Sequence, residues 1–459
     1  MKVVDLNRFL FREYDLRGIV GELIDEDVAY TLGLSYGSYV LNMGINMVVI
    51  GRDNRISSPN IAKALMKGIT ETGCSVVYLG EVTTPMFYFA RYSLKLYAGI
   101  MVTASHNPKE YNGFKMSFSD IGNAYGPLIQ EFYEFCSKKE FRKGEGNVTY
   151  FDIKESYIDY FVNTINIKNK DIKVVVDCGN GVGSIVIEDI LKRLGITYHL
   201  LYCTSDGNFP NHPADPSIEE YMLELKNKVV ELGYDLGIGI DGDADRVGIV
   251  SEKGEYIQPD LYLLFMAKYL KEDLNENKIL LDVKCSRALL DGLKESNING
   301  VMYRTGNSYL NMKMKEGKFS FGGEYSGHIF YRDRFAGFDD GIYAGVRFIE
   351  MISNSNVKVS DLLKKVKKYY SVFYEVKAGE IGKKEIVEKM KDYAHKKKYT
   401  TIEVDGVRIE FDDGWGLIRY SNTSPNLSIR YEGNTQESLN RIKEELDTKV
   451  NEFLKLVKE

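Results

Sequence analysis

Residues 98–115 read AGIMVTASHNPKEYNGFK, and the interpretation of the whole chain starts from this stretch. The first five residues form an uninterrupted apolar run, which is typical of a buried strand. Thr103, Ser105 and His106 follow at once, so polar and nucleophilic side chains stand where the strand runs into a loop. Open α/β sheets bind their ligands at this end of their strands. The stretch therefore predicts an α/β sheet with a reactive site at its edge.

The same succession of strand, polar or Gly-rich turn and helix occurs three times. It begins at NMVVIGRDNR (46–55), at KVVVDCGNGVG (173–183) and at KILLDVKCSR (278–287). This alternation is typical of α/β units with largely parallel sheets. After residue 369 the pattern changes to strands such as TIEVDGVRIEF (401–411) and LSIRYEG (427–433) between two helices, which indicates antiparallel strands in a small α+β unit.

The length of 459 residues is too great for one hydrophobic core. We expect three consecutive α/β domains with mixed, largely parallel sheets and a C-terminal α+β domain, arranged around a central cleft. The predicted boundaries are 1–149, 150–253, 254–368 and 369–459. Between the third and fourth domains, VKVSDLLKKVKKYY (357–370) is expected to be a helix whose lysines face solvent.

Composition excludes several classes of protein. A formal charge of -6 and a pI of about 5.7 argue against a general nucleic-acid-binding protein. No apolar stretch reaches the roughly 20 residues that span a bilayer, and residues 1–11 contain no signal-peptide core, so we expect a cytoplasmic protein that does not enter membranes. The five cysteines are odd in number and form no C-x-x-C pair, which indicates neither disulfides nor zinc.

The segment DGDADR (241–246) predicts a metal site. Asp241, Asp243 and Asp245 alternate after an apolar strand and place three hard oxygen ligands in one small region, which suits Mg²⁺. An EF-hand is excluded because Arg246 replaces the loop glycine and strands flank the segment. An ordinary acidic turn is the alternative, but three packed carboxylates without a cation would repel one another.

Three further polar segments follow strands or glycines. GNGVGS (179–184) is interpreted as a tight structural turn, because Ser184 replaces the third glycine of a dinucleotide-binding motif. GGEYSGH (322–328) offers a carboxylate, a hydroxyl and an imidazole for sugar hydroxyls, or is a β-turn with a satisfied histidine. RYSNTSPN (419–426) offers the donors that a phosphate dianion requires, or is a polar turn before Pro425.

Together, VTASHNPKEYNGFK, DGDADR, GGEYSGH and RYSNTSPN closely resemble the motifs of the α-D-phosphohexomutases, especially the bacterial-type phosphomannomutase/phosphoglucomutases. They occur in the same order over nearly the whole chain, and FREYDLRGIVGE (11–22), GRDNRISSP (51–59) and RDRFAGFDDGIYAG (332–345) strengthen the resemblance. The resemblance implies an enzyme that interconverts hexose 1-phosphate and hexose 6-phosphate through a phosphoserine and a 1,6-bisphosphate. It also implies Mg²⁺, glucose 1,6-bisphosphate as activator, and glucose or mannose phosphates as substrates.

The resemblance assigns roles to individual residues. Ser105 would carry the phosphoryl group and would hold Mg²⁺ together with Asp241, Asp243 and Asp245. Lys115 and His328 are the candidates for proton transfer, with Lys115 ranked first, and Arg17 and Arg246 complete the catalytic set. The expected substrate contacts are Tyr14, Arg17, His106, Lys284, Glu324, Ser326, His328, Arg419, Ser421, Asn422 and Thr423.

Two positions depart from related sequences and leave the hexose open. Asn307 stands in TGNS where many family members have histidine, and Tyr325 occupies the variable position of GGEYSGH. The alternatives are a phosphoglucosamine mutase, a metal-dependent sugar phosphatase and a non-catalytic sugar-phosphate-binding protein. The C-terminal domain is expected to act as a lid. The sequence leaves the choice between monomer and homodimer open.

Overall fold

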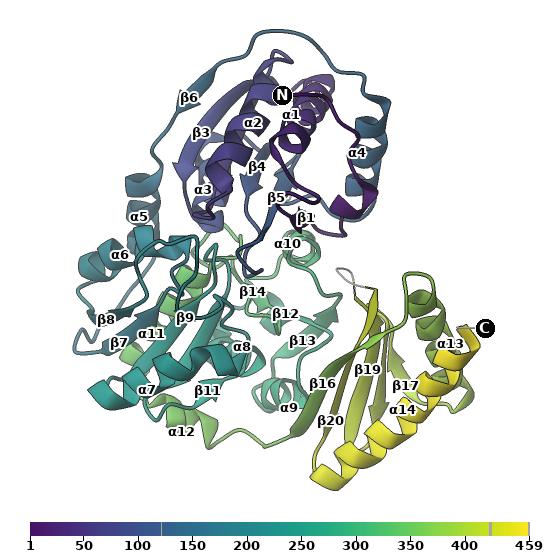
Figure 1. Cartoon of the computed structure of the whole chain (residues 1–459). Coiled ribbons are helices and arrows are strands. Elements are labelled where there is room, and N and C mark those ends of the chain that lie inside the picture. Colours follow the sequence, from purple (N-terminus) through teal and green to yellow (C-terminus); the bar gives the residue numbers. More distant parts are fainter. Residues whose placement is uncertain (121, 422–424, 458–459) are drawn as a thin grey trace.

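The computed structural model describes residues 1–120, 122–421 and 425–457. Four sheets follow one another along the chain, and each carries its own helices (Figure 1). We call these four units domains 1 to 4. The fold class expected from the sequence is confirmed, and the sheets of domains 1–3 are mixed because antiparallel strands lie on one side of each.

Domain 1 contains a six-stranded sheet in the order β1-β5-β4-β2-β3-β6. The strands are β1 (Leu16–Ile19), β2 (Met47–Arg52), β3 (Ser75–Glu81), β4 (Gly99–Val102), β5 (Tyr111–Ser117) and β6 (Val148–Tyr150). The helices are α1 (Glu26–Asn42), α2 (Ser58–Thr70), α3 (Thr84–Leu94) and α4 (Pro127–Lys138). Helices α1 and α2 pack so closely that a Cβ atom at Gly33 would lie 2.2 Å from the Leu65 carbonyl oxygen. The close approach is possible because glycine has no Cβ.

Domain 2 has five strands in the order β11-β10-β9-β7-β8. The strands are β7 (Lys173–Asp177), β8 (Thr197–Leu201), β9 (Leu236–Ile240), β10 (Val247–Ser251) and β11 (Tyr256–Ile257). The helices are α5 (Lys154–Asn163), α6 (Ile187–Leu194) and α7 (Leu223–Leu232). The turn at 179–184 packs against the DGDADR loop, where Val182 N donates to the Gly242 carbonyl oxygen at 3.0 Å. It therefore supports that loop, in keeping with the structural turn expected from the sequence.

Domain 3 has four strands in the order β13-β12-β14-β15. The strands are β12 (Lys278–Asp282), β13 (Asn299–Tyr303), β14 (Phe321–Gly323) and β15 (Ile329–Tyr331). The helices are α8 (Pro259–Tyr269), α9 (Arg287–Glu295), α10 (Asn307–Glu316), α11 (Gly341–Ser355) and α12 (Val359–Leu363).

The helix expected over 357–370 is much shorter in the structure. Helix α12 ends at Leu363, and the lysine-rich residues that follow form turns and then irregular chain before β16 begins at Tyr370. Four of the five residues in KKVKK are lysines, which present almost no apolar face for packing. The expectation of a continuous helix was therefore wrong, and this segment connects domain 3 to domain 4.

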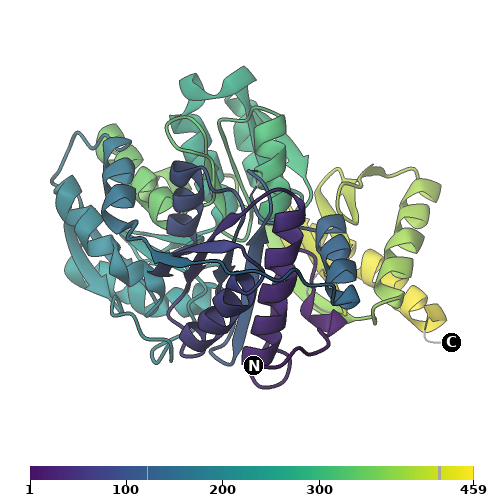
Figure 2. The same cartoon turned by 90° about the horizontal axis from the view of Figure 1, so that it is seen from above.

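Domain 4 is antiparallel throughout, with strands in the order β16-β20-β19-β18-β17. They are β16 (Tyr370–Lys377), β17 (Thr400–Ile402), β18 (Val407–Phe411), β19 (Gly414–Tyr420) and β20 (Asn426–Gly433). Helices α13 (Gly382–Lys396) and α14 (Gln436–Val457) pack on the sheet. Domain 4 stands to the right of the other domains in both overall views (Figures 1 and 2).

The hydrophobic core is divided unevenly among the domains. One continuous cluster of buried side chains draws residues from domains 1, 2 and 3. Domain 1 also has a second cluster of its own, and the main cluster of domain 4 contains residues of that domain alone. A small cluster of Val283, Trp415 and Leu417 joins domains 3 and 4. The described part of the chain contains no helix that is both long enough and apolar enough to cross a membrane.

Candidate active site

Ser105 lies in the loop that follows β4, with its side chain held toward domain 2. Its hydroxyl donates to Asp241 Oδ2 at 2.9 Å, and its backbone N–H donates to Thr103 Oγ1 at 2.9 Å. The residue is 3% exposed and has a φ of +51°, a left-handed conformation that is costly for a non-glycine residue. The loop thus fixes the hydroxyl in place at the expense of local strain.

Arg55 holds this loop and was not recognised from the sequence as a site residue. Its guanidinium donates to the carbonyl oxygens of Ser105, Asn107, Pro108 and Tyr111 at 2.6–3.0 Å, and the side chain is fully buried. Each bond therefore replaces water at a buried carbonyl. The available signal was its place in GRDNRISSP, the motif at the end of β2.

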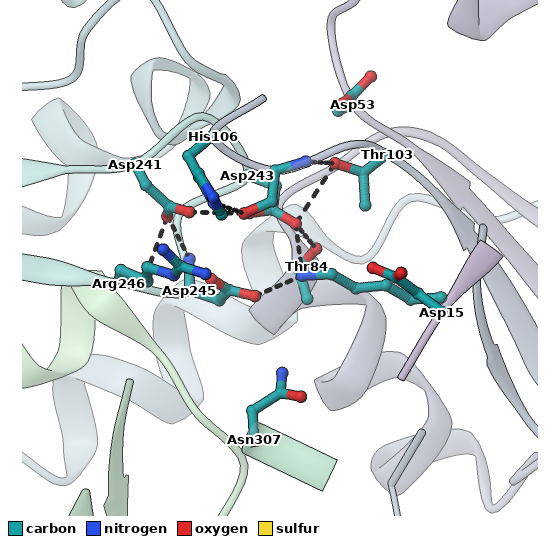
Figure 3. Close-up of polar contacts among 12 residues, drawn as sticks. Asp15, Asp53, Thr84, Thr103, His106, Asp241, Asp243, Asp245, Arg246 and Asn307 are labelled. Carbon is teal, nitrogen blue, oxygen red and sulfur yellow. Dashed lines mark hydrogen bonds and ion pairs between the residues drawn. The ribbon is translucent and has the colours of Figure 1, made fainter. Parts of the chain in front are cut away.

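The three aspartates of DGDADR lie in the loop between β9 and β10 and are fully buried (Figure 3). Asp241 Oδ1 accepts from the backbone N–H of Asp245 at 2.9 Å and of Arg246 at 3.0 Å. Asp243 Oδ2 accepts from Thr84 Oγ1 of domain 1 at 2.7 Å. One oxygen from each aspartate lies within 4.8 Å of the others, so the loop presents a compact group of possible metal ligands.

The electrostatics of this group fit a bound metal ion. Burial and the charges of Asp245 and Asp243 raise the pKa of Asp241 well above its usual value. The Oδ1 atoms of Asp243 and Asp245 are buried and have no hydrogen-bond donor in the described residues. Carboxylate oxygens of this kind are the ligands that hard divalent cations prefer.

Lys115 supplies the nearest positive charge. Its ammonium lies 2.7 Å from Asp243 Oδ2 and also contacts Asp245. Burial alone would lower its pKa, but the two carboxylates outweigh burial and raise the pKa well above the usual value for lysine. Lys115 is therefore a fixed cation in this arrangement and a weak proton acceptor.

His328 reaches the same loop from the turn between β14 and β15. Its Nδ1 lies 2.8 Å from Asp339 Oδ2 and 3.5 Å from Asp245 Oδ1, while its Nε2 accepts from Arg246 Nε at 3.0 Å. Burial opposes the charged form, but Asp245 and Asp339 raise the pKa of His328 above its usual 6.5. Asp339 was also missed in the sequence, although it stands in the motif RDRFAGFDDGIYAG.

Arg246 and His106 meet at Asp215. Arg246 Nη1 lies 3.9 Å from Asp215 Oδ1, and His106 Nε2 lies 4.0 Å from Asp215 Oδ2. His106 Nδ1 is 3.2 Å from the Ser105 hydroxyl. Burial lowers the pKa of His106 well below its usual value, and the positive charges of Arg246 and Arg17 add to the effect. A neutral imidazole therefore lies beside Ser105.

Arg17 belongs to this part of the site. Its Nη2 pairs with Asp15 Oδ2 at 2.5 Å, and its Nη1 donates to Asn107 Oδ1 at 2.5 Å. The structure thus brings Arg17 against the Ser105 loop.

The residues expected from the sequence to contact the sugar form a second group. Glu324 accepts from Ser326 Oγ at 2.8 Å and from the backbone N–H of Gly306 at 2.5 Å. Lys284 Nζ lies 3.3 Å from Asp282 Oδ2, at the end of β12. All of these residues except Ser326 and Lys284 are buried. The group presents carboxylate, hydroxyl and ammonium side chains from domain 3.

Tyr14 and Arg419 approach this second group from domains 1 and 4. The Tyr14 hydroxyl donates to the Thr305 carbonyl oxygen at 2.8 Å, and Arg419 Nε donates to Asp405 Oδ2 at 2.9 Å. Burial raises the pKa of Tyr14, which also responds to the charges of Arg419, Asp405 and Glu324. Ser421 N donates to the Asn426 carbonyl oxygen at 2.8 Å. Asn422 and Thr423 lie outside the described residues.

The side chain of Tyr325 contacts the interface between domains 3 and 4. The Arg430 guanidinium of domain 4 lies 3.8 Å from the centre of the Tyr325 ring, and the Tyr325 hydroxyl donates to Gln258 Oε1 at 2.9 Å. This variable position therefore contacts a neighbouring domain, whereas Glu324 and Ser326 on either side form the polar group described above.

Four domain families match the chain in order. They are the alpha/beta/alpha domains I, II and III of phosphoglucomutase/phosphomannomutase at residues 8–143, 155–254 and 258–369, and the C-terminal domain of phosphoglucomutase/phosphomannomutase at residues 355–449.

Individual proteins match over nearly their whole length. The chain is 38% identical over 443 residues to a phosphomannomutase/phosphoglucomutase of Pseudomonas aeruginosa, covering 96% of this chain and 95% of the relative. It is 38% identical over 447 residues to a phosphoglucomutase of Neisseria gonorrhoeae, covering 96% of both chains. The crystal structure of a phosphoglucomutase/phosphomannomutase family protein from Burkholderia thailandensis superimposes with a TM-score of 0.90 at 33% identity, covering 98% of both chains.

Proposed function

Because the chain belongs to the phosphoglucomutase/phosphomannomutase family, it is a hexose-phosphate mutase, and we propose that Ser105 carries the phosphoryl group that the reaction moves. One observation carries this proposal. The Ser105 hydroxyl, held in a strained conformation, donates to Asp241 in a cluster of three buried aspartates. A hydroxyl in such a position can carry a phosphoryl group close to a metal ion.

The proposed cycle has two balanced transfers. In the first, the bond between phosphorus and Ser105 Oγ breaks, a bond forms to the free C1 or C6 hydroxyl of the hexose phosphate, and the hydroxyl proton passes to a base. The resulting 1,6-bisphosphate turns over, and its other phosphoryl group returns to Ser105 Oγ while the sugar oxygen regains a proton. Glucose 1,6-bisphosphate would act as activator by phosphorylating Ser105 in the same way.

Asp241, Asp243 and Asp245 would hold Mg²⁺ together with an oxygen on Ser105. When bound, Mg²⁺ supplies positive charge that stabilises a loose, metaphosphate-like transition state. Lys115 adds a second cation beside these aspartates. Thr84 and the backbone N–H groups of the loop orient the carboxylates by hydrogen bonds. Arg55 holds the Ser105 loop in register with them.

We propose His328 before Lys115 for proton transfer, which reverses the order expected from the sequence. The pKa of Lys115 is raised so far that it keeps its proton, whereas that of His328 is raised from a starting point near neutrality. A group with a pKa near the working pH transfers protons best. Nε2 of His328 must exchange its bond with Arg246 for one to the sugar hydroxyl.

The second group would hold the substrate. Glu324, Ser326 and Lys284 would bind sugar hydroxyls and phosphate, and Arg419 with Ser421 would bind the phosphate that does not react. Since Arg419 lies on the separately folded domain 4, we further propose that domain 4 rotates onto the bound sugar. Glucose and mannose phosphates are the proposed substrates, in line with the names of the relatives.

Phosphorus NMR tests these assignments in one experiment. Glucose 1-phosphate, mannose 1-phosphate and glucosamine 1-phosphate are followed together with Mg²⁺ and a trace of glucose 1,6-bisphosphate. We expect the glucose and mannose esters to become 6-phosphates, Ser105→Ala to abolish this conversion, and Ser137→Ala, on the exposed face of α4, to leave it unchanged. Conversion of the glucosamine ester alone would identify a phosphoglucosamine mutase. Release of inorganic phosphate would identify a phosphatase, and full activity of Ser105→Ala would refute the role of Ser105.

A further inference from the structure

A second cavity lies between domains 1 and 3, apart from the groups assigned to phosphoryl transfer. It has a volume of about 230 Å³. Residues of α3 and α10 border it, together with Asp120, Gly122, Asn123, Arg332 and the segment 336–339. Its wall includes Tyr88, Arg91, Asn307, Arg332, Phe338 and Asp339. Neither Ser105 nor any residue of DGDADR borders it. The cavity is therefore separate from the metal site.

Arg91 brings a buried charge to the cavity wall. The side chain is only 5% exposed, and its guanidinium donates to two carbonyl oxygens, those of Tyr97 at 2.8 Å and Ser119 at 2.7 Å. Within the described residues no carboxylate forms an ion pair with it, although the charge of Asp120 acts on it from a distance, and its guanidinium lies 5.6 Å from the centre of the Phe87 ring. Burial lowers its pKa to about 10, so Arg91 stays charged at neutral pH. A buried guanidinium without a counter-ion is unusual and favours an anion beside it.

Arg332 adds a second charge to the same wall. Its side chain is half-buried, and among the residues that the structure describes it has neither an ion pair nor a hydrogen bond. Burial is the sole cause found for the lowering of its pKa. Its aliphatic part packs on Gly337, where an added Cβ would lie 2.6 Å from Arg332 Cγ. Packing thus holds the guanidinium at the cavity.

The other charges of the wall are neutralised locally. Lys315 pairs with Asp120 at 2.6 Å, and Asp339 lies 2.8 Å from the His328 imidazole. Two positive charges, those of Arg91 and Arg332, therefore remain without an ion-paired carboxylate in the described wall. Their combined charge matches a dianion.

Aromatic side chains form much of the remaining wall. The rings of Tyr88 and Phe338 lie 5.8 Å apart, and Tyr92 and Tyr97 also border the cavity. Such rings bind apolar or planar groups through dispersion and the hydrophobic effect. The lining is thus suited to a small molecule with an apolar body and a dianionic head.

We propose that this cavity is a second ligand site, which binds a small phosphate monoester with an apolar body between Arg91 and Arg332. Asp339 links this site to the reacting groups, because it borders the cavity on one side and contacts His328 on the other. Asn307, also in the wall, donates to Asp339 Oδ2 at 3.1 Å. A ligand there alters the surroundings of His328 without touching the sugar, so it changes the turnover rate.

Phenyl phosphate is a suitable probe because it has an apolar ring and a phosphate dianion but no sugar. Calorimetric titration is carried out on the full chain after equilibration with excess glucose 1,6-bisphosphate, so that this ligand and any sugar phosphate formed from it fill the substrate site before phenyl phosphate is added. We expect one equivalent of phenyl phosphate to bind, and Arg332→Met to weaken the affinity at least tenfold. Inorganic phosphate, which has no apolar body, should bind more weakly than phenyl phosphate. The titration measures binding alone, so its outcome does not depend on whether the proposed roles of Ser105 and His328 are correct.

Arg334→Met is the matched control, because Arg334 lies two residues away and pairs with Glu350 at 2.7 Å outside the cavity. It should bind phenyl phosphate as the native protein does. The half-buried side chain of Arg332 forms no hydrogen bond or ion pair in the described residues, so the Arg332→Met variant should fold normally, which circular dichroism verifies. Absence of binding under bisphosphate saturation, or equal binding by Arg332→Met, would overturn the proposal.

Kinetics provide the second readout. Phenyl phosphate should change kcat even at saturating glucose 1-phosphate, and this change should disappear in Arg332→Met. Purely competitive inhibition would place phenyl phosphate in the substrate site and overturn the proposal.

Discussion

Domains 1–3 and domain 4 are built into the molecule in different ways. One continuous cluster of buried side chains joins the first three, beside a second cluster within domain 1, and their reactive groups contact one another across domain boundaries, as Lys115 does with Asp243 and Arg246 with His328. Domain 4 has a separate core and meets domain 3 through the small cluster at Trp415 and through arginines that contact backbone carbonyls.

This difference separates two tasks. Phosphoryl transfer needs reacting atoms fixed to a fraction of an ångström, which a shared, close-packed core provides. Phosphate capture requires a site that opens and closes, and small polar interfaces between domains permit such motion. We therefore expect substitutions in domains 1–3 to affect kcat and stability, and substitutions in domain 4 to affect KM.

Arg55→Met should have the largest effect. Removing this buried guanidinium leaves Asp53 unpaired and four carbonyl oxygens around the Ser105 loop without their donor. We expect the free energy of unfolding to fall by about 3–5 kcal/mol, and kcat to fall by roughly 10²-fold because the loop shifts. Urea unfolding and the mutase assay measure these changes.

Arg52→Met provides the control within the same motif. Arg52 pairs with Glu81 at 3.0 Å in a partly exposed position, so its loss should cost about 1 kcal/mol or less. Equal effects of the two substitutions would contradict the special role of Arg55.

Asp340 should make the folding stability of domains 1–3 depend on pH. It caps α11 by accepting from Tyr343 N at 2.8 Å and bonds the Tyr157 hydroxyl of α5 at 2.6 Å, and burial raises its pKa to about 7. The folded state then binds more protons than the unfolded state between pH 4 and 7, so the contribution of Asp340 to stability is lost as the pH rises through this window. At 1.36 kcal/mol per pKa unit, a rise of about three units makes the loss roughly 4 kcal/mol.

Asp340→Asn isolates this effect. Relative to the native protein, the variant should become more stable by roughly 4 kcal/mol as the pH rises from 4 to 8, in urea titrations that monitor domains 1–3. A stability difference that does not vary with pH would show that Asp340 has an ordinary pKa.

Arg419→Met should test the role of domain 4. The guanidinium pairs with Asp405, and Arg419 lies near the end of β19, two residues before Ser421. We expect KM for glucose 1-phosphate to rise roughly 10- to 100-fold, because a hydrogen bond to a charged group contributes about 1.5–3 kcal/mol. Arg441→Met, at an exposed pair with Asp413, should leave KM unchanged. A fall in kcat with constant KM would mean that domain 4 takes part in the transfer itself.

Trp415 should report domain motion through its fluorescence without any substitution. It is the one tryptophan in the sequence and lies fully buried where domains 3 and 4 meet. The Arg408 guanidinium lies 3.7 Å from the centre of its ring. Binding of glucose 1,6-bisphosphate should shift its fluorescence and reduce the radius of gyration in solution scattering. If neither quantity changes, domain 4 does not rotate.

Much of the architecture was predictable from local patterns. Apolar runs followed by polar turns located the strands that carry Ser105 and the aspartates, and the change of pattern after residue 369 located the antiparallel domain. The helix expected over 357–370 failed because lysine-rich sequence favours a helix without giving it a face to bury. Tyr325 likewise stands in a sugar-recognition motif but packs against Arg430, which no local pattern reveals.

The sequence by itself determined the order of the motifs, the class of each domain and the residue types available for chemistry, because these depend on periodicity and turn preferences among neighbouring residues. The tertiary structure alone decided which groups meet. Lys115 pairs with Asp243, Arg55 holds the Ser105 loop, and Asp339 lies between His328 and the second cavity. These contacts join residues that are distant in the chain or lie on different elements, and the packing of one sheet against the next sets their distances, burial and pKa values.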